Sequence, residues 1–268
     1  MARVAIMITS CDAYKDCWKP MIYSLDKYWP DCEYPRYIVT NYEEDDSLPD
    51  TQIIKVGDDK RSWCTLAKRG LEAIGADYVV FFQEDYWLAK KVDNEAIKAH
   101  VQYMEDYSVD YLKITHDILR DNLRIEESDY CYNPLDIRYS FNTAMAIWRV
   151  EVIKNLLIDG WSGWEFERQI IPYLIEHSIK IDSRCLYSKT IEEKGLTDIK
   201  GGAIIRGVWT DSAVEFLEEN GLEDIISKRE RMGKLTNWLY RHSPGPQSPF
   251  RWPFWAALRI LKDLKLNW

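Results

Sequence analysis

The sequence predicts an α/β protein with a mostly parallel sheet flanked by helices and with a C-terminal helical tail. Through the first half of the chain, β-rich apolar runs alternate with stretches of helical spacing, which is typical of βαβ units. The strongest run, 77–85, has five consecutive apolar residues and then ends abruptly in acids. Hydrophobic residues make up 46% of the 268 residues, enough for a substantial core.

The expected elements of the first half follow in order. Residues 3–9 are continuously apolar, which favours a strand covered on both faces, and 16–29 have helical apolar spacing that Pro30 ends. Short β-rich runs predict strands at 35–41 and 51–57. A helix is expected at 62–75, because Ser62 is a good N-cap and Gly75 a good C-terminal stop, and the strand at 77–85 follows.

The second half is less regular. Residue patterns predict helices at 94–107, 150–160 and 160–179 and strands at 110–115 and 141–149. Residues 116–140 are polar and rich in Tyr, which predicts a loop over a site. Residues 241–253 hold four of the ten prolines and predict a linker or extended arm, followed by a short amphipathic helix at 254–268.

Composition excludes several classes of protein. The net charge of −9 disfavours nucleic-acid binding. The sequence contains no run of 18 apolar residues, so no membrane-spanning helix is predicted. The N-terminus has the character of a buried strand and not of a signal peptide, so we expect a cytoplasmic protein. None of the six cysteines has a partner at CxxC spacing, which argues against a zinc or redox motif and predicts free thiols.

The charge is unevenly distributed along the chain. Residues 228–268 hold nine Lys or Arg against two acids, a net of +7, and seven aromatic residues, while the other 227 residues carry −16. We therefore expect a catalytic domain at 1–227 and a separate tail at 228–268. The basic, Trp-rich tail predicts peripheral contact with the inner face of the cell membrane, and docking on the catalytic domain or on a dimer partner is the alternative.

Polar and aromatic side chains follow each of the first four predicted strands. Open α/β sheets bind ligands at the carboxyl ends of their strands, so these side chains should converge on one crevice. The candidates, in chain order, are Thr9, Ser10, Tyr14, Asn41, Arg61, Trp63, Glu84 and Asp85. No GxGxxG follows the first strand and no GxxxxGK[ST] occurs, which argues against a dinucleotide-binding dehydrogenase and a P-loop nucleotidase.

The segment FFQEDYWL (81–88) holds the most specific signal, because acids just beyond a buried strand can hold a divalent cation that bridges a diphosphate. This segment resembles the Asp-x-Asp motif of GT-A-type glycosyltransferases, in particular small bacterial enzymes of capsule and lipopolysaccharide synthesis. The resemblance covers about residues 3–210. It implies that Asp85 contacts a metal or the sugar diphosphate, that Glu84 lies near the donor ribose or sugar, and that Thr9, Ser10 and Tyr14 border the nucleobase.

The motif departs from the family pattern at its first position. Gln83 stands where the first Asp would be, which leaves Asp85 as the matching acid and as the predicted metal ligand. The expected cofactor is Mn²⁺ or Mg²⁺. Since Gln is a poorer ligand, and some members of this fold work without metal, metal-independent chemistry is the alternative.

A second signal is the run Gly160–Arg168, in which a Gly-Trp-Ser-Gly turn delivers two carboxylates to the start of a helix. Inverting glycosyl transfer needs a carboxylate base, and the family resemblance places one at such a helix start. The family pattern has an apolar residue three positions after the base. Ile170 satisfies it for Glu167, whereas Arg168 does not for Glu165, so Glu167 is the predicted base and Glu165 the second candidate.

Together these features predict a glycosyltransferase that moves a sugar from a nucleotide-diphosphate sugar to a cell-surface glycan or lipid-linked acceptor. Lys200 and Arg206, in a Gly-rich segment, are expected to close over the donor diphosphate. A sugar nucleotidyltransferase is one alternative, although its usual Gly-rich loop is missing between Thr9 and Tyr14. A non-catalytic glycan-binding or scaffold protein is the other. The sequence gives no oligomeric state.

Overall fold

The computed structural model describes residues 2–57, 62–115, 123–135, 140, 141, 143, 145–199 and 202–233. The chain forms two compact units, Met1–Gly201 and Gly202–Trp268. The first unit holds the large sheet and its helices. The predicted boundary between residues 227 and 228 falls within the second unit and stays a prediction.

The first unit is built on an eight-stranded sheet with the order β3-β2-β1-β4-β7-β5-β8-β6. Strands β1, β2, β3 and β4 are parallel neighbours, and β5 is parallel to β8, while β7 and β6 run antiparallel to their neighbours. The strands are β1 Val4–Thr9, β2 Arg36–Thr40, β3 Thr51–Lys55, β4 Tyr78–Gln83, β5 Tyr111–Lys113, β6 Tyr130–Tyr132, β7 Ala146–Arg149 and β8 Ser183–Leu186. The predicted α/β class with a mostly parallel sheet is confirmed.

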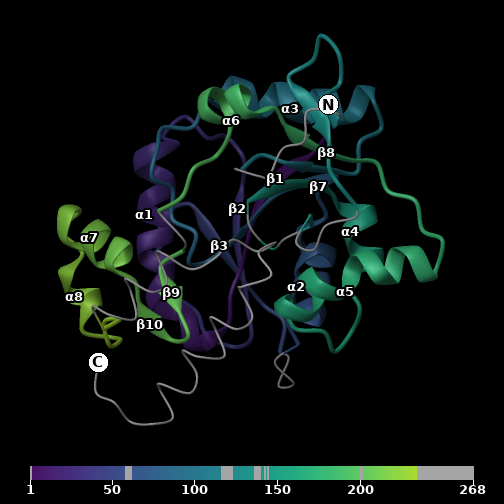
Figure 1. Ribbon diagram of the computed structural model, residues 1–268. Coiled ribbons are helices and arrows are strands. Elements are labelled where there is room, and N and C mark those ends of the chain that lie inside the picture. The colour runs from purple at the N-terminus through teal and green to yellow at the C-terminus, as the bar shows by residue number, and fades with distance from the viewer. Residues whose placement is uncertain are drawn as a thin grey trace. The chain divides into compact units, whose positions relative to one another are not determined.

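Helices cover both faces of this sheet, with α1 and α2 on opposite sides (Figure 1). The helices of the first unit are η1 Asp12–Cys17, α1 Trp18–Tyr28, α2 Trp63–Ile74, α3 Asn94–Asp106, α4 Val150–Leu156, α5 Gly163–Glu176 and α6 Ser188–Lys194. Side chains alternate across a strand, so Ala5 and Met7 of β1 and Val79 and Phe81 of β4 share one face. That face packs against α2, α4 and α5 in one hydrophobic core.

Helix α2 lies unusually close to the sheet. A Cβ added at Gly70, in the middle of α2, would lie 2.5 and 2.6 Å from the two γ-methyl carbons of Val39 in β2. Glycine is unfavourable inside a helix, so its presence here reflects this close approach. The N-terminus of α2 is thereby held against the carboxyl ends of β1 and β2, which is where the candidate site lies.

The second half of the chain departs from the sequence-based expectations. Residues 116–140 were expected to form a loop, but they contain the edge strand β6, whose three residues are too few to show a period. The strand expected at 141–149 is shorter in the structure, where it is β7, Ala146–Arg149. Strand β8 and helix α6 were not predicted, because neither is long enough to carry a clear period.

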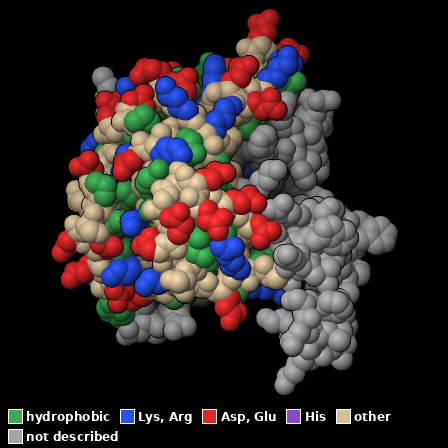
Figure 2. All heavy atoms as spheres, turned by 90° about the vertical axis from the view of Figure 1, so that its left-hand side faces the viewer, with side chains coloured by type: hydrophobic (Ala, Val, Ile, Leu, Met, Phe, Trp, Pro, Cys, Tyr) green, Lys and Arg blue, Asp and Glu red, His purple; other side chains and the backbone are tan. Residues whose placement is uncertain are grey.

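The second unit consists, over its described part, of a short hairpin and two helices. The hairpin pairs β9 Ile204–Ile205 with β10 Val208–Trp209, and it is followed by α7 Asp211–Glu219 and α8 Glu223–Ile226. The predicted linker at 241–253 and helix at 254–268 lie outside the described residues. Among the described helices, none has the length and apolar character needed to cross a membrane. On the face shown in Figure 2, acidic and basic side chains are interspersed and hydrophobic ones are scattered.

Candidate active site

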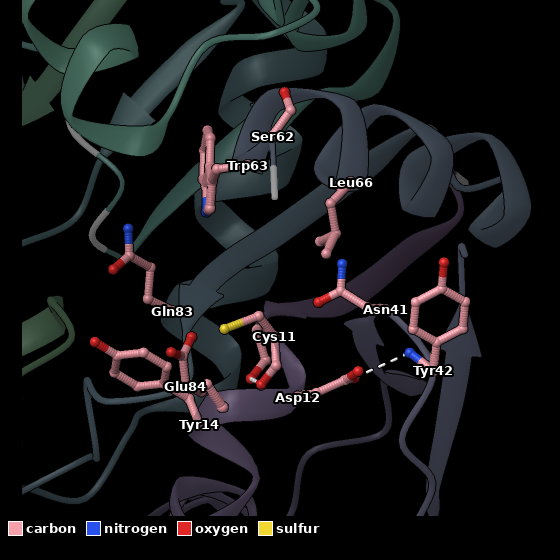
Figure 3. Close-up of a pocket in the computed structure, with 12 residues that line it drawn as sticks. Cys11, Asp12, Tyr14, Asn41, Tyr42, Ser62, Trp63, Leu66, Gln83 and Glu84 are labelled. Carbon is pink, nitrogen blue, oxygen red and sulfur yellow. Dashed lines mark hydrogen bonds between the residues drawn. The ribbon is translucent and has the colours of Figure 1, made fainter. Parts of the chain in front are cut away.

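A cavity of about 570 Å³ lies at the carboxyl ends of three parallel strands of the first unit. Its walls come from the segment after β1, the segment after β2, the start of α2 and the end of β4. The lining residues are Ser10, Cys11, Asp12, Ala13, Tyr14, Asn41, Tyr42, Ser62, Trp63, Leu66, Gln83 and Glu84. Figure 3 shows Trp63 and Leu66 on one side of the opening, with Tyr14 and Glu84 facing it from another. The ends of three of the four predicted strands therefore meet at one cavity, while residues 58–61, which follow β3, lie outside the described residues.

Register across the sheet explains why these segments meet. Thr9, the last residue of β1, is paired with Val39 of β2 on one side and with Gln83 of β4 on the other. The next amides continue the pattern, because Ser10 N–H donates to the Val39 carbonyl (2.9 Å) and Glu84 N–H donates to the Thr9 carbonyl (3.2 Å). The three strands thus end at one level, and the residues that follow them share one edge of the sheet.

The side chain of Asp12 joins the first two of these segments. Its Oδ1 atom accepts hydrogen bonds from the Tyr42 N–H (2.9 Å), the Glu43 N–H (3.0 Å) and the Thr40 hydroxyl (3.0 Å). Burial acts to raise the pKa of Asp12, but these hydrogen bonds outweigh it, so that the pKa lies below its usual value. The ionised carboxylate therefore holds the Tyr42 backbone at the rim of the cavity.

Ser62 joins α2 to the turn that precedes α5. Its hydroxyl oxygen accepts from the Thr65 N–H (3.3 Å) as the N-cap of α2, and it also accepts from the Gly160 N–H (3.0 Å). The Cys64 N–H donates to the Trp161 carbonyl (3.0 Å), a second link between the same segments. The Gly-Trp-Ser-Gly turn is thus fixed to the helix that lines the cavity.

Glu165 serves the start of α5. Its Oε2 atom accepts from the N–H (2.8 Å) and the hydroxyl (2.7 Å) of Ser162, while the Ser162 hydroxyl accepts from the Glu165 N–H, which completes a capping box. The hydrogen bond from the Ser162 N–H is the main cause that lowers the pKa of Glu165. This carboxylate stabilises the helix terminus.

Glu167, two positions further along α5, is partly buried and has different partners. Its Oε1 atom accepts from the N–H (2.8 Å) and from the hydroxyl (2.9 Å) of Thr143. Burial is the largest influence on this carboxyl and raises its pKa, although the two hydrogen bonds and the charge of Lys113 act in the opposite direction. A carboxylate with a raised pKa is better suited to accept a proton than an exposed one.

Aromatic packing connects α5 to the cavity. Trp63, which lines the cavity, packs against Phe166 of α5 with ring centroids 5.7 Å apart and against Phe81 of β4 at 5.8 Å. A Cβ added at Gly163 would lie 3.5 Å from Trp63 and 3.7 Å from Thr143. Thr143 and the cavity-lining Trp63 thus lie against the same glycine, while neither Glu167 nor Glu165 is among the residues that line the cavity.

The structure brings together five of the predicted donor-binding residues, since Ser10, Tyr14, Asn41, Trp63 and Glu84 all line the cavity. Their role in binding a donor stays a prediction. Thr9 and Asp85 are not among the lining residues, and the fully buried Thr9 hydroxyl donates to the Phe82 carbonyl (3.1 Å).

The donor-binding roles of the three predicted cations stay predictions. Arg61 and Lys200 lie outside the described residues. Arg206 belongs to the second unit, where it occupies the hairpin turn between β9 and β10 with a φ of 52°. The expectation that Lys200 and Arg206 close over a diphosphate stays a prediction.

Sequence reasoning did not select Asp12 or Tyr42 as site residues. Asp12 lies three positions after β1, and Tyr42 lies two positions after β2, so position after a strand end was an available signal for both. Nothing local distinguishes Asp12 from the nearby acids of the 43–46 run. Its three hydrogen bonds to the segment after β2 distinguish it only in the folded chain.

The acids at the cavity fit a metal that arrives with a diphosphate better than one held by protein alone. Over the described ranges, no group of three or more His, Cys, Asp or Glu side chains is arranged to hold an ion. Glu84 lines the cavity, whereas the Asp12 carboxylate already accepts three hydrogen bonds. Mg²⁺ is commonly bound by one or two carboxylates together with substrate phosphates and water, so Glu84 and the adjacent Asp85 are chemically suitable ligands.

Comparison of the sequence with protein-family models gives no match, and neither does comparison with curated proteins. Solved structures with a similar fold include Staphylococcus aureus TarS 1–349, at 12% identity and a TM-score of 0.49, over 95% of this chain and 78% of that one. The chain spans 36% of the longer TarS structure.

Two further similar structures contain bound nucleotides. One is the mannosyltransferase PcManGT from Pyrobaculum calidifontis with GDP-Man and Mn²⁺ (15% identity, TM-score 0.39, 62% of this chain and 50% of that one). The other is CMP:2-keto-3-deoxy-manno-octonic acid synthetase with CTP (14% identity, TM-score 0.48, 83% of this chain and 100% of that one). These likenesses are distant, and the fold class follows from the molecule's own strands. A mostly parallel sheet begins with β1, helices cover both of its faces, and its fourth strand is followed by the acidic Glu84–Asp85 segment, so the fold is an α/β fold.

Proposed function

We propose that this chain is a nucleotide-sugar-dependent glycosyltransferase, whose donor occupies the cavity at the ends of β1, β2 and β4. The observation that carries the proposal is the combination of an open cavity at a parallel strand edge with a partly buried carboxylate, Glu167, on the helix whose Phe166 packs against the cavity-lining Trp63. Ligands of open α/β sheets bind at this edge, and inverting transfer needs such a carboxylate.

The lining of the cavity offers the groups that a nucleoside diphosphate requires. The rings of Tyr14, Tyr42 and Trp63 provide flat faces for a base or a sugar ring, and the Asn41 amide can both donate and accept hydrogen bonds. Glu84 can accept hydrogen bonds from ribose or sugar hydroxyls. A volume of about 570 Å³ lies in the range of small-molecule sites.

In the proposed reaction, Glu167 accepts the proton of the acceptor hydroxyl while the acceptor oxygen forms a bond to the anomeric carbon. The bond between that carbon and the diphosphate oxygen breaks, and the nucleoside diphosphate leaves with the electron pair. A divalent metal held by Glu84 or Asp85 together with the diphosphate would neutralise the charge of the leaving group. The acceptor class, a cell-surface glycan or lipid-linked sugar, remains the prediction made from the sequence.

Calorimetric titration with UDP, GDP, CDP and CTP, each in Mg²⁺, Mn²⁺ and EDTA, tests the proposal. Selective binding of a nucleoside diphosphate is expected, with tighter binding in the presence of metal. A preference for the triphosphate supports a nucleotidyltransferase instead. Absence of binding to every nucleotide contradicts both enzymes and leaves a glycan-binding or scaffold protein.

A matched pair of tyrosine variants tests where the nucleotide binds. Tyr42 lines the cavity and is 51% exposed, while Tyr107 lies far along the chain on α3's C-terminal side and is 64% exposed. Stacking of a base on an aromatic ring contributes about 1–3 kcal/mol, so Tyr42→Ala should weaken nucleotide binding by about 5- to 150-fold. Tyr107→Ala removes an equally exposed ring and should leave the Kd unchanged.

A further inference from the structure

The carboxylate of Glu167 is held by a residue that is distant in sequence. Thr143 donates both its backbone N–H and its hydroxyl to the same oxygen, Oε1, at 2.8 and 2.9 Å. Thr143 is itself buried, with 5% exposure, so water does not replace these bonds easily. Both hydrogen bonds from Thr143 go to Oε1, and the other carboxylate oxygen, Oε2, takes no part in this contact.

A buried cation acts on the same carboxylate. Lys113 is the last residue of β5 and is only 3% exposed. It is the charged group among the described residues whose field favours the ionised form of Glu167. The nearest charged neighbours on α5 itself are directed elsewhere, since Glu165 bonds Ser162 and Arg168 donates to the Trp164 carbonyl (3.0 Å).

Thr143 adjoins the cavity without lining it. Thr143 and Trp63 both pack against the Cα position of Gly163, where a Cβ would be 3.7 and 3.5 Å away from them. Neither Thr143 nor Lys113 is among the cavity-lining residues. A change at either residue can therefore alter Glu167 without removing a contact to a molecule in the cavity.

We propose that Thr143 is a positioning residue that orients Glu167 as the base of the reaction, and that the buried charge of Lys113 assists it by favouring the carboxylate form. This inference rests on the proposed function, because it assigns the pair to the base of that reaction. Burial favours the protonated carboxyl, and the Thr143 hydrogen bonds and the Lys113 charge act in the opposite direction. Removing the Thr143 hydroxyl or the Lys113 charge should shift the titration of Glu167 upward.

The first test measures that titration directly and needs no substrate. The full chain is labelled with ¹³C at the Glu carboxyl groups, and the Glu167 resonance is assigned by its absence from Glu167→Gln. A hydrogen bond to a charged group favours the charged form, so Thr143→Val should raise the titration midpoint by about one to two pH units. Lys113→Met should raise it too, while Thr143→Ser keeps the hydroxyl and should match the unchanged protein.

Thr190→Val is the matched control, because the buried Thr190 hydroxyl also donates to a carboxylate, Asp129 Oδ1 at 3.1 Å. It should leave the Glu167 resonance unmoved. If Thr143→Val and Lys113→Met both titrate at the original midpoint, or if Thr190→Val shifts the resonance equally, the proposal is overturned. Should Lys113→Met fail to fold, the Thr143 Val and Ser variants decide the outcome by themselves.

The second test separates this inference from the proposed function. With a donor found by calorimetry, the acidic limb of the kcat profile should move with the Glu167 midpoint in Thr143→Val, while the KM for the donor stays constant. A moved resonance with full turnover in Glu167→Gln removes Glu167 from the reaction and overturns the proposed base. An unmoved resonance with an inactive Glu167→Gln overturns only the roles of Thr143 and Lys113.

Discussion

At the scale of single residues, two carboxylates that are two positions apart on α5 have different surroundings. Glu165 completes the capping box with Ser162, and Glu167 accepts two hydrogen bonds from the buried Thr143. Residues two apart on a helix differ by about 200° in direction, so the same turn directs one to the terminus and the other inward. The pKa values follow this division, lowered for Glu165 and raised for Glu167.

Replacement of Glu167 distinguishes the two carboxylates by function. Glu167→Gln should keep nucleotide affinity within about twofold and lower turnover by at least about 100-fold, because general base catalysis contributes about 10²–10⁴-fold. Glu165→Gln retains a side-chain oxygen for the Ser162 hydrogen bonds, so its main effect should be on helix stability. Calorimetry and steady-state kinetics on both variants measure this. Equal turnover in the Glu167 variant and the unchanged protein would falsify the assignment.

At the scale of elements, the close contact between α2 and β2 sets the position of the cavity wall. Leu66, Trp63 and the N-cap Ser62 all line the cavity from the first turns of α2. Gly70, further along the helix, allows the backbone to lie directly over Val39. The packing of the helix is therefore coupled to the geometry of the site.

Replacing Gly70 with Ala tests this contact by setting two effects against each other. Alanine in a helix is favoured over glycine by about 1 kcal/mol. The added methyl would lie 2.5–2.6 Å from the branched Val39 side chain, and overpacking of this kind costs about 1–3 kcal/mol. We expect the clash to dominate, with a net loss in the free energy of unfolding measured by urea denaturation.

The double variant Gly70→Ala with Val39→Ala is the control for this prediction. Removal of the γ-methyl groups should make the Gly70→Ala change stabilising in the Val39→Ala background, since only the helix preference remains. A double-mutant cycle reports the difference. An equal effect of Gly70→Ala in both backgrounds would show that Val39 does not set the helix position.

At the scale of the whole molecule, His100 and Asp198 make opposite contributions to the pH dependence of the free energy of unfolding. His100 is 2% exposed, and burial lowers its pKa to about 4. Between pH 6.5 and 4 the unfolded chain binds a proton at this residue and the folded chain does not, so the His100 contribution falls as the pH is lowered.

Asp198 behaves in the reverse sense, because burial raises its pKa to about 6. The folded chain keeps that proton up to about pH 6, so its contribution is lost as the pH rises from 3.8 to 6.

At 1.36 kcal/mol per pKa unit, each of the two shifts changes the free energy of unfolding by about 3 kcal/mol. Because the two changes have opposite signs on acidification, they nearly cancel in the unchanged protein. Single substitutions should expose them. In urea unfolding at pH 7 and 4.5, His100→Asn should gain stability on acidification relative to the unchanged protein, and Asp198→Asn should lose it. Comparing differences between variants removes the effect of the exposed carboxylates. Identical pH dependence in all three proteins would contradict both assignments.

The uneven charge of the chain leads to a prediction about membranes. The +7 segment 228–268 holds seven aromatic residues, and beyond residue 233 it lies outside the described residues, so membrane contact stays a prediction from composition. Each basic residue near an anionic surface contributes about 1 kcal/mol. The full chain should float with vesicles of phosphatidylglycerol and phosphatidylethanolamine, and a 1–240 truncation should not. Equal flotation of the two would remove the tail as the membrane contact.

The first half of the fold was predictable from the sequence because its signals are local. Strand β4 is a continuous apolar run, and α2 has both a Ser62 cap and a Gly75 stop, so a window of a few residues defines each element. Strands β6 and β8 have three and four residues, too short for any period. Their pairing depends on partners more than 50 positions away in sequence.

The sequence by itself determined the parallel sheet, the edge of the sheet at which polar residues gather and the two carboxylates at the start of α5. The tertiary structure decided how each side chain is used. It gave Asp12 three donors from the end of β2 and the residues after it, brought Glu84 but not Asp85 into the cavity lining, and paired Glu167 with Thr143, which is 24 positions away. Periodicity reports which face a residue occupies, because it depends only on neighbours in the chain. The ionisation and hydrogen bonding of a carboxylate depend on the groups that folding brings to it.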